Sequence, residues 1–120
     1  MTKVFVSLPV AGRSKDEIQK ARKQAEVEAA YILHTNEIEF IDTWIYEDPP
    51  EYLEGDKIGL WYLGKSLEKL TKADVIYCAR GWTSFRGCII EHDAAKFYGV
   101  KVLTYSNYLA MKGYTLDEKE

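Results

Sequence analysis

A helical glutamate that follows a glycine-containing turn is the first group in this sequence that could do chemistry. Residues 81–91 read Gly-Trp-Thr-Ser-Phe-Arg-Gly-Cys-Ile-Ile-Glu. Gly87 and Glu91 are four residues apart, so on a helix they share one face, and the glycine leaves the carboxylate open to a ligand. Such a carboxylate can act as a nucleophile or as a general acid or base. The plainer interpretation is a solvated surface residue, as most helical glutamates are.

A second candidate segment follows the first apolar run of the chain. Residues 7–14 read Ser-Leu-Pro-Val-Ala-Gly-Arg-Ser. They place Gly12, Arg13 and a hydroxyl at the start of a predicted helix, where free backbone N–H groups favour an anion and Arg13 adds a charge-assisted contact. One glycine is too few for a dinucleotide-binding fingerprint. The alternative interpretation is an ordinary turn with an exposed arginine.

The remaining reactive residue types form no recognisable pattern. His34 and His92 belong to no nucleophile or ligand arrangement, which indicates structural or surface roles. Cys78 and Cys88 are too few for a disulfide scaffold and lack the paired spacing of a zinc site, so we expect reduced, inert core thiols. The sequence therefore predicts no metal site and no cofactor.

Strands and helices alternate along the chain and place both candidate segments after strands. Short β-branched and aromatic runs predict strands at residues 4–6, 38–41, 74–78 and 100–105. One helix begins at the capping box of residues 14–17, a second carries regularly spaced leucines over 60–70, and a third spans 87–98. This alternation predicts an α/β, Rossmann-like (flavodoxin-like) three-layer sandwich with a parallel sheet of about four to five strands.

Three loops are expected to form the ligand site of such a sheet. Ligands bind beyond the carboxyl ends of parallel strands, at the point where the strand order reverses. That rule nominates residues 7–13, 42–56 and 79–86. The second of these loops is long, without period, and contains Trp44, Tyr46 and Tyr52. It is either a binding loop with stacking surfaces or an aromatic cover for a helix.

Composition excludes several classes of protein. The chain of 120 residues has the size of one domain, and its 47% hydrophobic and 29% charged residues are globular values. A net charge of -3 without a basic block argues against a nucleic-acid polymer as a partner. No run reaches the ~20 apolar residues of a membrane span, and the N-terminus reads as a strand rather than a signal peptide. We therefore expect a cytoplasmic protein that does not bind membranes.

These segments together resemble one family. Residues 74–105 contain a recognisable order of features. A strand is followed by Gly-Trp, a hydroxyl residue, Arg-Gly, a glutamate four positions after that glycine, and then Gly-Val and a strand. This pattern is similar to the nucleoside 2-deoxyribosyltransferase-like proteins. A first strand ending in Ser7-Leu8-Pro9 resembles more narrowly a small branch often associated with phages and prophages. The resemblance spans roughly residues 3–105, which implies a deoxyribosyltransferase-like domain over 1–105. Residues 106–120 would be a C-terminal tail, partly disordered or in an oligomer contact.

The resemblance implies roles for individual residues. Glu91 would be the catalytic nucleophile, attacking the anomeric carbon of a deoxyribosyl group and expelling the base. Gly12 and Arg13 would face the sugar or phosphate. Ser84 would donate a hydroxyl, and Trp82 would wall the pocket. The full set of expected ligand-binding positions is Ser7, Leu8, Pro9, Gly12, Arg13, Ser66, Trp82, Ser84 and Gly87.

Two positions depart from the family pattern. Family enzymes commonly carry an aspartate on the second helix, eight residues before the aspartate at the strand start, and here that position is Ser66. The family serine usually lies six residues before the glutamate, where this chain has Phe85, with Ser84 one residue earlier. Loss of an acid catalyst lowers a rate by typically ~10²–10⁴-fold. The loop carboxylates that are alternatives for the missing acid are Asp42, Glu47, Asp48 and Asp56.

The leading functional hypothesis is a nucleoside or nucleotide N-glycosidase or 2-deoxyribosyltransferase that acts through Glu91. The alternative is a non-catalytic nucleotide-binding protein of the same fold, such as a phage protein that sequesters a nucleotide signal. An interaction protein with a vestigial site is a third class. The expected partner is a small nucleoside or nucleotide, in the bacterial cytoplasm or in that of the host of a phage. The resemblance also implies a homo-oligomer, whose contacts would include Tyr105, Tyr108 and Tyr114 unless these rings cover their own subunit.

Overall fold

The computed structural model describes residues 1–114 and alternates strands with helices as predicted. Each predicted strand and helix is present, with ends that differ by a few residues. No helix of the described part is long and apolar enough to cross a bilayer. The elements in chain order are β1 (Thr2–Ser7), α1 (Lys15–Leu33), β2 (Ile38–Phe40), α2 (Asp56–Leu70), β3 (Val75–Cys78), a 3₁₀ turn (Trp82–Ser84), α3 (Arg86–Phe97), β4 (Lys101–Thr104) and α4 (Tyr105–Met111).

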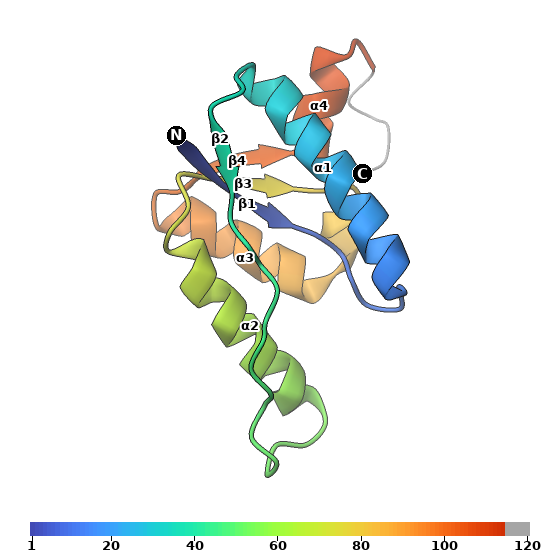
Figure 1. The fold of residues 1–120 in the computed structure, drawn as a ribbon, viewed down its shortest axis with the longest axis vertical. Helices are drawn as coiled ribbons and strands as arrows, with labels where there is room; N and C mark the ends of the chain where they lie inside the picture. Colours follow the sequence, from blue (N-terminus) through green and yellow to red (C-terminus); the bar gives the residue numbers. More distant parts are fainter. Residues whose placement is uncertain (115–120) are drawn as a thin grey trace.

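The four strands form one parallel sheet in the order β2-β1-β3-β4. Helices α1 and α4 cover one face of the sheet, and α2 and α3 lie on the other (Figure 1). This three-layer arrangement is the Rossmann-like α/β fold expected from the sequence. β1 is a central strand with β2 on one side and β3 on the other, so successive connections run in opposite directions away from it.

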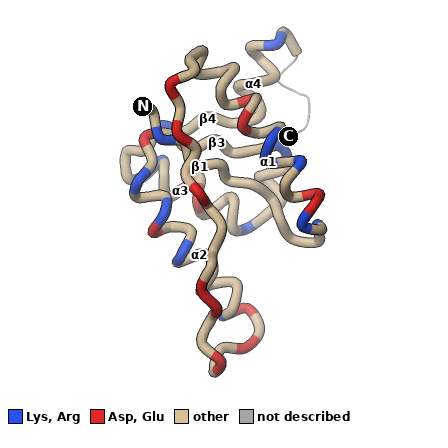
Figure 2. The backbone as a smooth tube through the Cα atoms, in the orientation of Figure 1, with Lys and Arg blue, Asp and Glu red and all other residues tan. Residues whose placement is uncertain are grey.

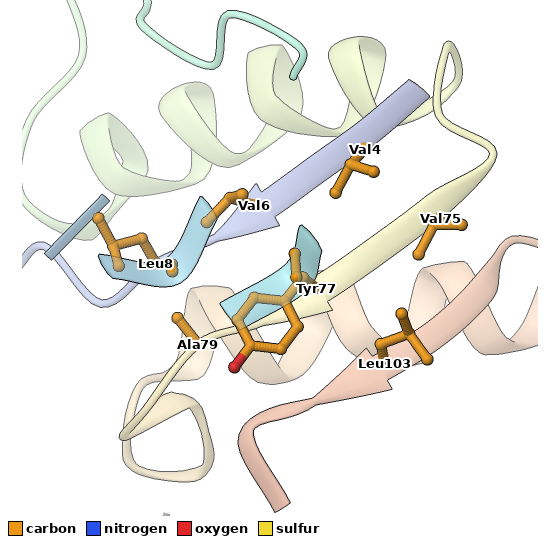
Figure 3. Close-up of a cluster of buried hydrophobic side chains, with 9 residues drawn as sticks. Val4, Val6, Leu8, Val75, Tyr77, Ala79 and Leu103 are labelled. Atoms are coloured by element: carbon orange, nitrogen blue, oxygen red, sulfur yellow. The ribbon is translucent and has the colours of Figure 1, made fainter. Parts of the chain in front are cut away.

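Both faces of the central strands are buried, which explains their continuous apolar sequence. Val4, Val6 and Tyr77 point toward α1, where they form one core cluster (Figure 3). Phe5 and Ile76, the neighbours of these residues in the strands, point into a second cluster beneath α2 and α3. Successive buried residues of β1 and β3 therefore pack alternately into two separate cores.

Helix α1 begins where the capping box predicts. The Ser14 hydroxyl accepts a hydrogen bond from the Glu17 N–H at 3.2 Å, and the Glu17 carboxylate accepts one from the Ser14 N–H at 2.8 Å. Ala25 and Ala29 are fully buried, so small side chains bring the helix close to the sheet. The helix ends at His34, which adopts the left-handed conformation.

The C-terminal segment is more ordered than expected. Thr104 and Asn107 form a second capping box that starts α4, which places a helix where a tail is predicted. The Tyr108 ring meets Tyr31 of α1 edge-on at 5.7 Å between centroids, and Tyr105 stacks on Tyr108. These two tyrosines therefore cover their own subunit. Residues 115–120 of the predicted tail lie outside the described part of the chain.

Residues 41–55 leave the sheet and run along α2 to form a projection (Figure 1). The projection makes the molecule elongated, with extents of 49 × 30 × 29 Å. Acidic residues gather along it, whereas basic residues are more frequent around the sheet (Figure 2). The exposed acidic side chains near its tip are Glu47, Asp48, Glu51, Glu54 and Asp56.

Candidate functional site

A cleft opens at the carboxyl end of β1. The chain leaves β1 for β2 on one side and returns for β3 on the other, so the strand order reverses at this point. Ligands of parallel α/β sheets bind at such reversals. The cleft has a volume of about 930 Å³, which lies in the range of small-molecule sites. Parts of all three loops nominated by the sequence line it, namely residues 8–11, 42–46 and 85–86.

Two helices each present one face to the cleft. Lining residues recur at positions 15, 18, 19 and 22 of α1 and at 59, 62, 63 and 66 of α2, which is the spacing of one helix face. The sequence singles out Ser66 on α2. Lys15, Gln19 and Arg22 are missed because they lie beside the apolar stripe of α1 and resemble solvated positions. The only signal that could have found them is this shared spacing.

Glu91 is a buried carboxylate at the edge of the cleft. It lies one turn beyond Gly87 on α3 and is only 8% exposed. Ser7, the last residue of β1, donates its Oγ hydrogen to Glu91 Oε1 at 2.6 Å. A Cβ atom added at Gly87 would meet no atom within 4 Å, so the space beside this glycine is open. Gly87 therefore leaves open space one helical turn before the buried carboxylate.

Burial controls the charge of this carboxylate. Removal from water raises the pKa of Glu91 above its ordinary value of 4.5, and hydrogen bonds from Ser7 and Ser66 oppose the rise. β1, α2 and α3 therefore all contribute to one small polar cluster. Burial also raises the pKa of the neighbouring Cys88 thiol, to about 11. This thiol stays protonated at neutral pH, as expected for an inert cysteine.

The segment after β2 supplies an aromatic wall. Trp44 and Tyr46 line the cleft together with Tyr62 of α2. Lys15 Nζ lies 5.7 Å from the centroid of the Trp44 ring, a cation–π contact that joins α1 to this segment. Tyr52, by contrast, is 82% exposed and is not part of the lining. The first part of the predicted loop is thus a cleft wall with flat rings, which suits a planar ligand.

Asp42 is the one carboxylate of the four loop alternatives that lines the cleft. Hydrogen bonds from the Tyr46 hydroxyl and the Trp44 N–H lower the pKa of Asp42. It is therefore ionised at neutral pH and has no proton to give to a leaving group. No cluster of three or more His, Cys, Asp or Glu in residues 1–114 is placed to hold a metal ion. The other three alternatives lie outside the lining: Glu47 and Asp48 on the projection, and Asp56 at the start of α2.

Arg22 is a half-buried cation in the cleft wall. Burial lowers the pKa of its guanidinium, and the nearby carboxylates of Glu26 and Asp42 oppose that effect. Within the described chain, no hydrogen bond or ion pair engages this guanidinium. A guanidinium with free N–H groups inside a cleft can bind a ligand that presents oxygen atoms.

Most of the residues predicted from the sequence line or support the cleft. Gly12 and Arg13 do not, because they belong to the exposed turn before α1, where Gly12 adopts a φ of 77°. Their arrangement fits the plainer interpretation of a turn with an exposed arginine. The predicted residues that the fold does bring together are Ser7, Leu8, Pro9, Ser66, Gly87 and Glu91.

Trp82 and Ser84 do not line the cleft. Both residues fall in the 3₁₀ turn before α3, outside the cleft lining. The turn directs Trp82 inward, where its ring stacks on His92 at 4.3 Å between centroids and packs against the core cluster of Phe5. Ser84 is exposed. Phe85, the next residue, does line the cleft.

Comparisons with known proteins bear on the fold alone. No family model matches this chain, and neither does any curated protein sequence. A solved structure that does match is described as a conserved protein from Enterococcus faecalis V583, with a TM-score of 0.55 and 15% sequence identity. The match covers 87% of this chain and 62% of the other, so this chain spans less than two thirds of that protein's length. The likeness shows a shared fold.

Proposed function

We propose that the protein binds a nucleoside or nucleotide in the cleft and breaks or transfers its N-glycosidic bond through Glu91. The observation that carries this proposal is the carboxylate itself. It is buried at the edge of a ligand-sized cleft, at the reversal of strand order, and a hydroxyl hydrogen bond of 2.6 Å fixes one of its oxygens. The aromatic wall formed by residues 44–46 and α2 supports a planar ligand.

The reaction would use Glu91 as a nucleophile. One carboxylate oxygen attacks the anomeric carbon while the carbon–nitrogen bond breaks, and the base leaves with the electron pair of that bond. The departing base takes a proton from water, because Asp42 is ionised and Ser66 stands where the family carries an acid. Water or a second base then attacks the same carbon, loses a proton, and releases the Glu91 carboxylate.

Ser7 would orient the nucleophile. Its hydroxyl holds Oε1 of Glu91, and Ser66 bonds to the same carboxylate from the cleft side. Ser7 pairs with Cys78 of β3 at the centre of the sheet, so its hydroxyl ties the carboxylate to the central strands. A nucleophile held in this way loses little orientational freedom when the ligand binds.

Binding without turnover is the second candidate function, and a specific observation favours it. Burial raises the pKa of Glu91, which favours the protonated, non-nucleophilic form, and Asp42, the other carboxylate in the lining, is ionised and cannot assist the leaving base. The same cleft would then serve a nucleotide-binding protein, such as one that sequesters a nucleotide signal. The two functions share a ligand and differ in whether the glycosidic bond breaks.

The deciding experiment combines base release with binding. The purified protein is incubated with deoxynucleosides, their 5′-monophosphates and cyclic nucleotides, free base is measured by chromatography, and binding by thermal shift. We expect base release that Glu91→Gln abolishes. Glu28→Gln is the matched control, because Glu28 is an equally buried helical glutamate outside this cleft. Equal release from the wild type and Glu91→Gln would exclude the nucleophile, and binding without release would establish the second function.

A further inference from the structure

The edge of β1 that faces β2 is only partly paired. In this parallel pair, the Thr2 N–H donates to the Glu37 carbonyl at 3.0 Å, and the Ile41 N–H donates to the Val4 carbonyl at 2.9 Å. Alternate residues of β1 thus turn their backbone groups toward β2. β2 ends at Phe40, and the chain then leaves the sheet to form the projection. Within residues 1–114, the bond from Ile41 is the last one across this edge.

Val6 is the next residue of β1 that faces this edge. Its side chain packs in the core beneath α1 (Figure 3), and the residue is among those that line the cleft. Val6 is only 2% exposed. No backbone or side-chain group of the described chain bonds to its N–H or C=O across this edge. A buried donor and acceptor that both lack partners raise the free energy of the empty cleft.

The arrangement selects a ligand chemistry. The N–H and C=O of one strand residue lie side by side, so their best partner carries an acceptor beside a donor on one flat edge. The lactam and amidine edges of nucleobases have this pattern, whereas a phosphate offers acceptors only. A peptide strand is a poor alternative, because β1 ends at Ser7 and Val6 is the last strand residue on this edge, which is too short for a ladder.

We infer that Val6 binds the base of the ligand by pairing its backbone N–H and C=O with the acceptor–donor edge of that base. Trp44 and Tyr62 would flank the plane of the ring, since both line the same cleft. This inference rests on the nucleoside or nucleotide ligand proposed above, but not on the reaction at Glu91. It makes the strand backbone, rather than a side chain, the group that recognises the base.

Amide hydrogen exchange of Val6 tests this inference directly. Glu91→Gln protein is used so that no ligand is consumed, and the probes are the four deoxynucleoside 5′-monophosphates. Phe5 is the internal control, because its amide faces β3 and is paired there. We expect the Val6 amide to exchange at least about tenfold faster than that of Phe5 in the free protein, and a bound probe to slow Val6 by about tenfold while Phe5 is unchanged. Equal rates in the free protein would overturn the inference, and so would binding that leaves Val6 unaffected or binding of none of the four probes.

Modified ligands give a second test that leaves the protein unchanged. Methylation of the donor nitrogen on the base edge, as in N3-methylthymidine 5′-monophosphate, should weaken binding about tenfold relative to the parent. Deoxyuridine 5′-monophosphate is the control, because it differs from the thymidine nucleotide by a methyl group away from that edge. Equal affinity of the parent and its N-methyl derivative would contradict the pairing. Protection of Val6 without base release would leave this inference standing and remove the proposed reaction, and the reverse result would do the opposite.

Discussion

Two buried glutamates lie on helices over opposite faces of the sheet, and each is bonded to a hydroxyl from a central strand. Glu28 of α1 accepts a hydrogen bond from the Tyr77 hydroxyl at 2.7 Å, and Glu91 of α3 accepts one from Ser7 at 2.6 Å. The two residues are 5% and 8% exposed. By residue type, burial and first partner they are nearly equivalent.

Their surroundings differ. Glu28 Oε2 accepts a hydrogen bond from the Gln24 side-chain amide at 2.9 Å, so both of its oxygens have partners within the protein. Glu91 borders the main cleft, and Ser66, which also bonds to it, lines the same cleft. The comparison teaches that burial alone does not make a carboxylate structural or reactive. What separates the two sites is the opening that each carboxylate borders: a cavity of about 380 Å³ beside Glu28, whose oxygens are both bonded, and the cleft of about 930 Å³ beside Glu91.

The largest effect on stability should follow from removing the Tyr77 hydroxyl that bonds to Glu28. Tyr77→Phe leaves the buried Glu28 carboxylate short of a donor, and we expect the free energy of unfolding to fall by about 2–3 kcal/mol in urea denaturation. Ser7→Ala removes the corresponding hydroxyl at Glu91. We expect it to lower the free energy of unfolding by about 1 kcal/mol, because water in the cleft can replace the hydroxyl. Equal losses of stability in the two variants would contradict the distinction between the Glu28 and Glu91 sites.

A second carboxylate beside Glu91 should make the protein a better catalyst. Ser66→Asp places an acid on α2 beside Glu91, where mutual repulsion keeps one carboxyl group protonated for the leaving base. We expect base release to rise by at least about tenfold, at the lower end of general-acid effects. Ser66→Asn has nearly the same shape without the charge and should not accelerate the reaction. An equal gain in both variants would show that shape, not acid catalysis, limits the rate.

Helix α1 carries both Glu28 and the cleft residue Arg22. Substitution of Arg22 therefore tests the cleft wall. Arg22→Gln removes the unpaired guanidinium and should weaken binding of a deoxynucleoside 5′-monophosphate about tenfold by titration calorimetry. Arg13→Gln, in the exposed turn before the helix, should change the affinity less than about twofold. The reverse order of effects would return ligand binding to the turn that the sequence favoured.

The smallest effect concerns the pH dependence of stability at Glu91. Because the folded protein holds this carboxyl with a raised pKa, ionisation destabilises the fold as pH rises from 4.5 through that raised value. Glu91→Gln removes this cost, so we expect the variant to be more stable by about 0.5–2 kcal/mol at neutral pH. The advantage should vanish below pH 4.5, where both states of the wild type are protonated. A gain that persists in acid would show that charge burial is not its cause.

The sequence identified the elements better than it identified their contacts. Strand runs and the Ser14–Glu17 capping box depend on neighbouring residues, and the structure confirms both. The bond between Ser7 and Glu91 joins residues 84 apart, so it depends on strand order and could only be anticipated through the switch-point rule. Local pattern also failed to show that a 3₁₀ turn directs Trp82 into the core and brings Phe85 to the cleft.

Two further misses have physical causes. Arg22 looks like a solvated position because the sequence shows the apolar stripe of α1 but not what faces its flank. Helix α4 was overlooked because it has only seven residues, too few for a clear period, although Thr104 and Asn107 mark its start. The unpaired backbone of Val6 carries no sequence signal at all, since it results from where β2 ends.

The projection gives the two walls of the cleft unequal stability. One wall belongs to β1 and α3, whose loss would require unfolding of the whole domain. The other wall, residues 42–46, is tied to α2 by few polar contacts, among them the bond from Lys69 Nζ to the Asp42 carbonyl at 2.9 Å. We expect this segment to open at a lower free energy than the strands and helices around it. Such opening would admit a ligand without moving Glu91. Ligand entry and the reaction would then depend on different cooperative units of the fold.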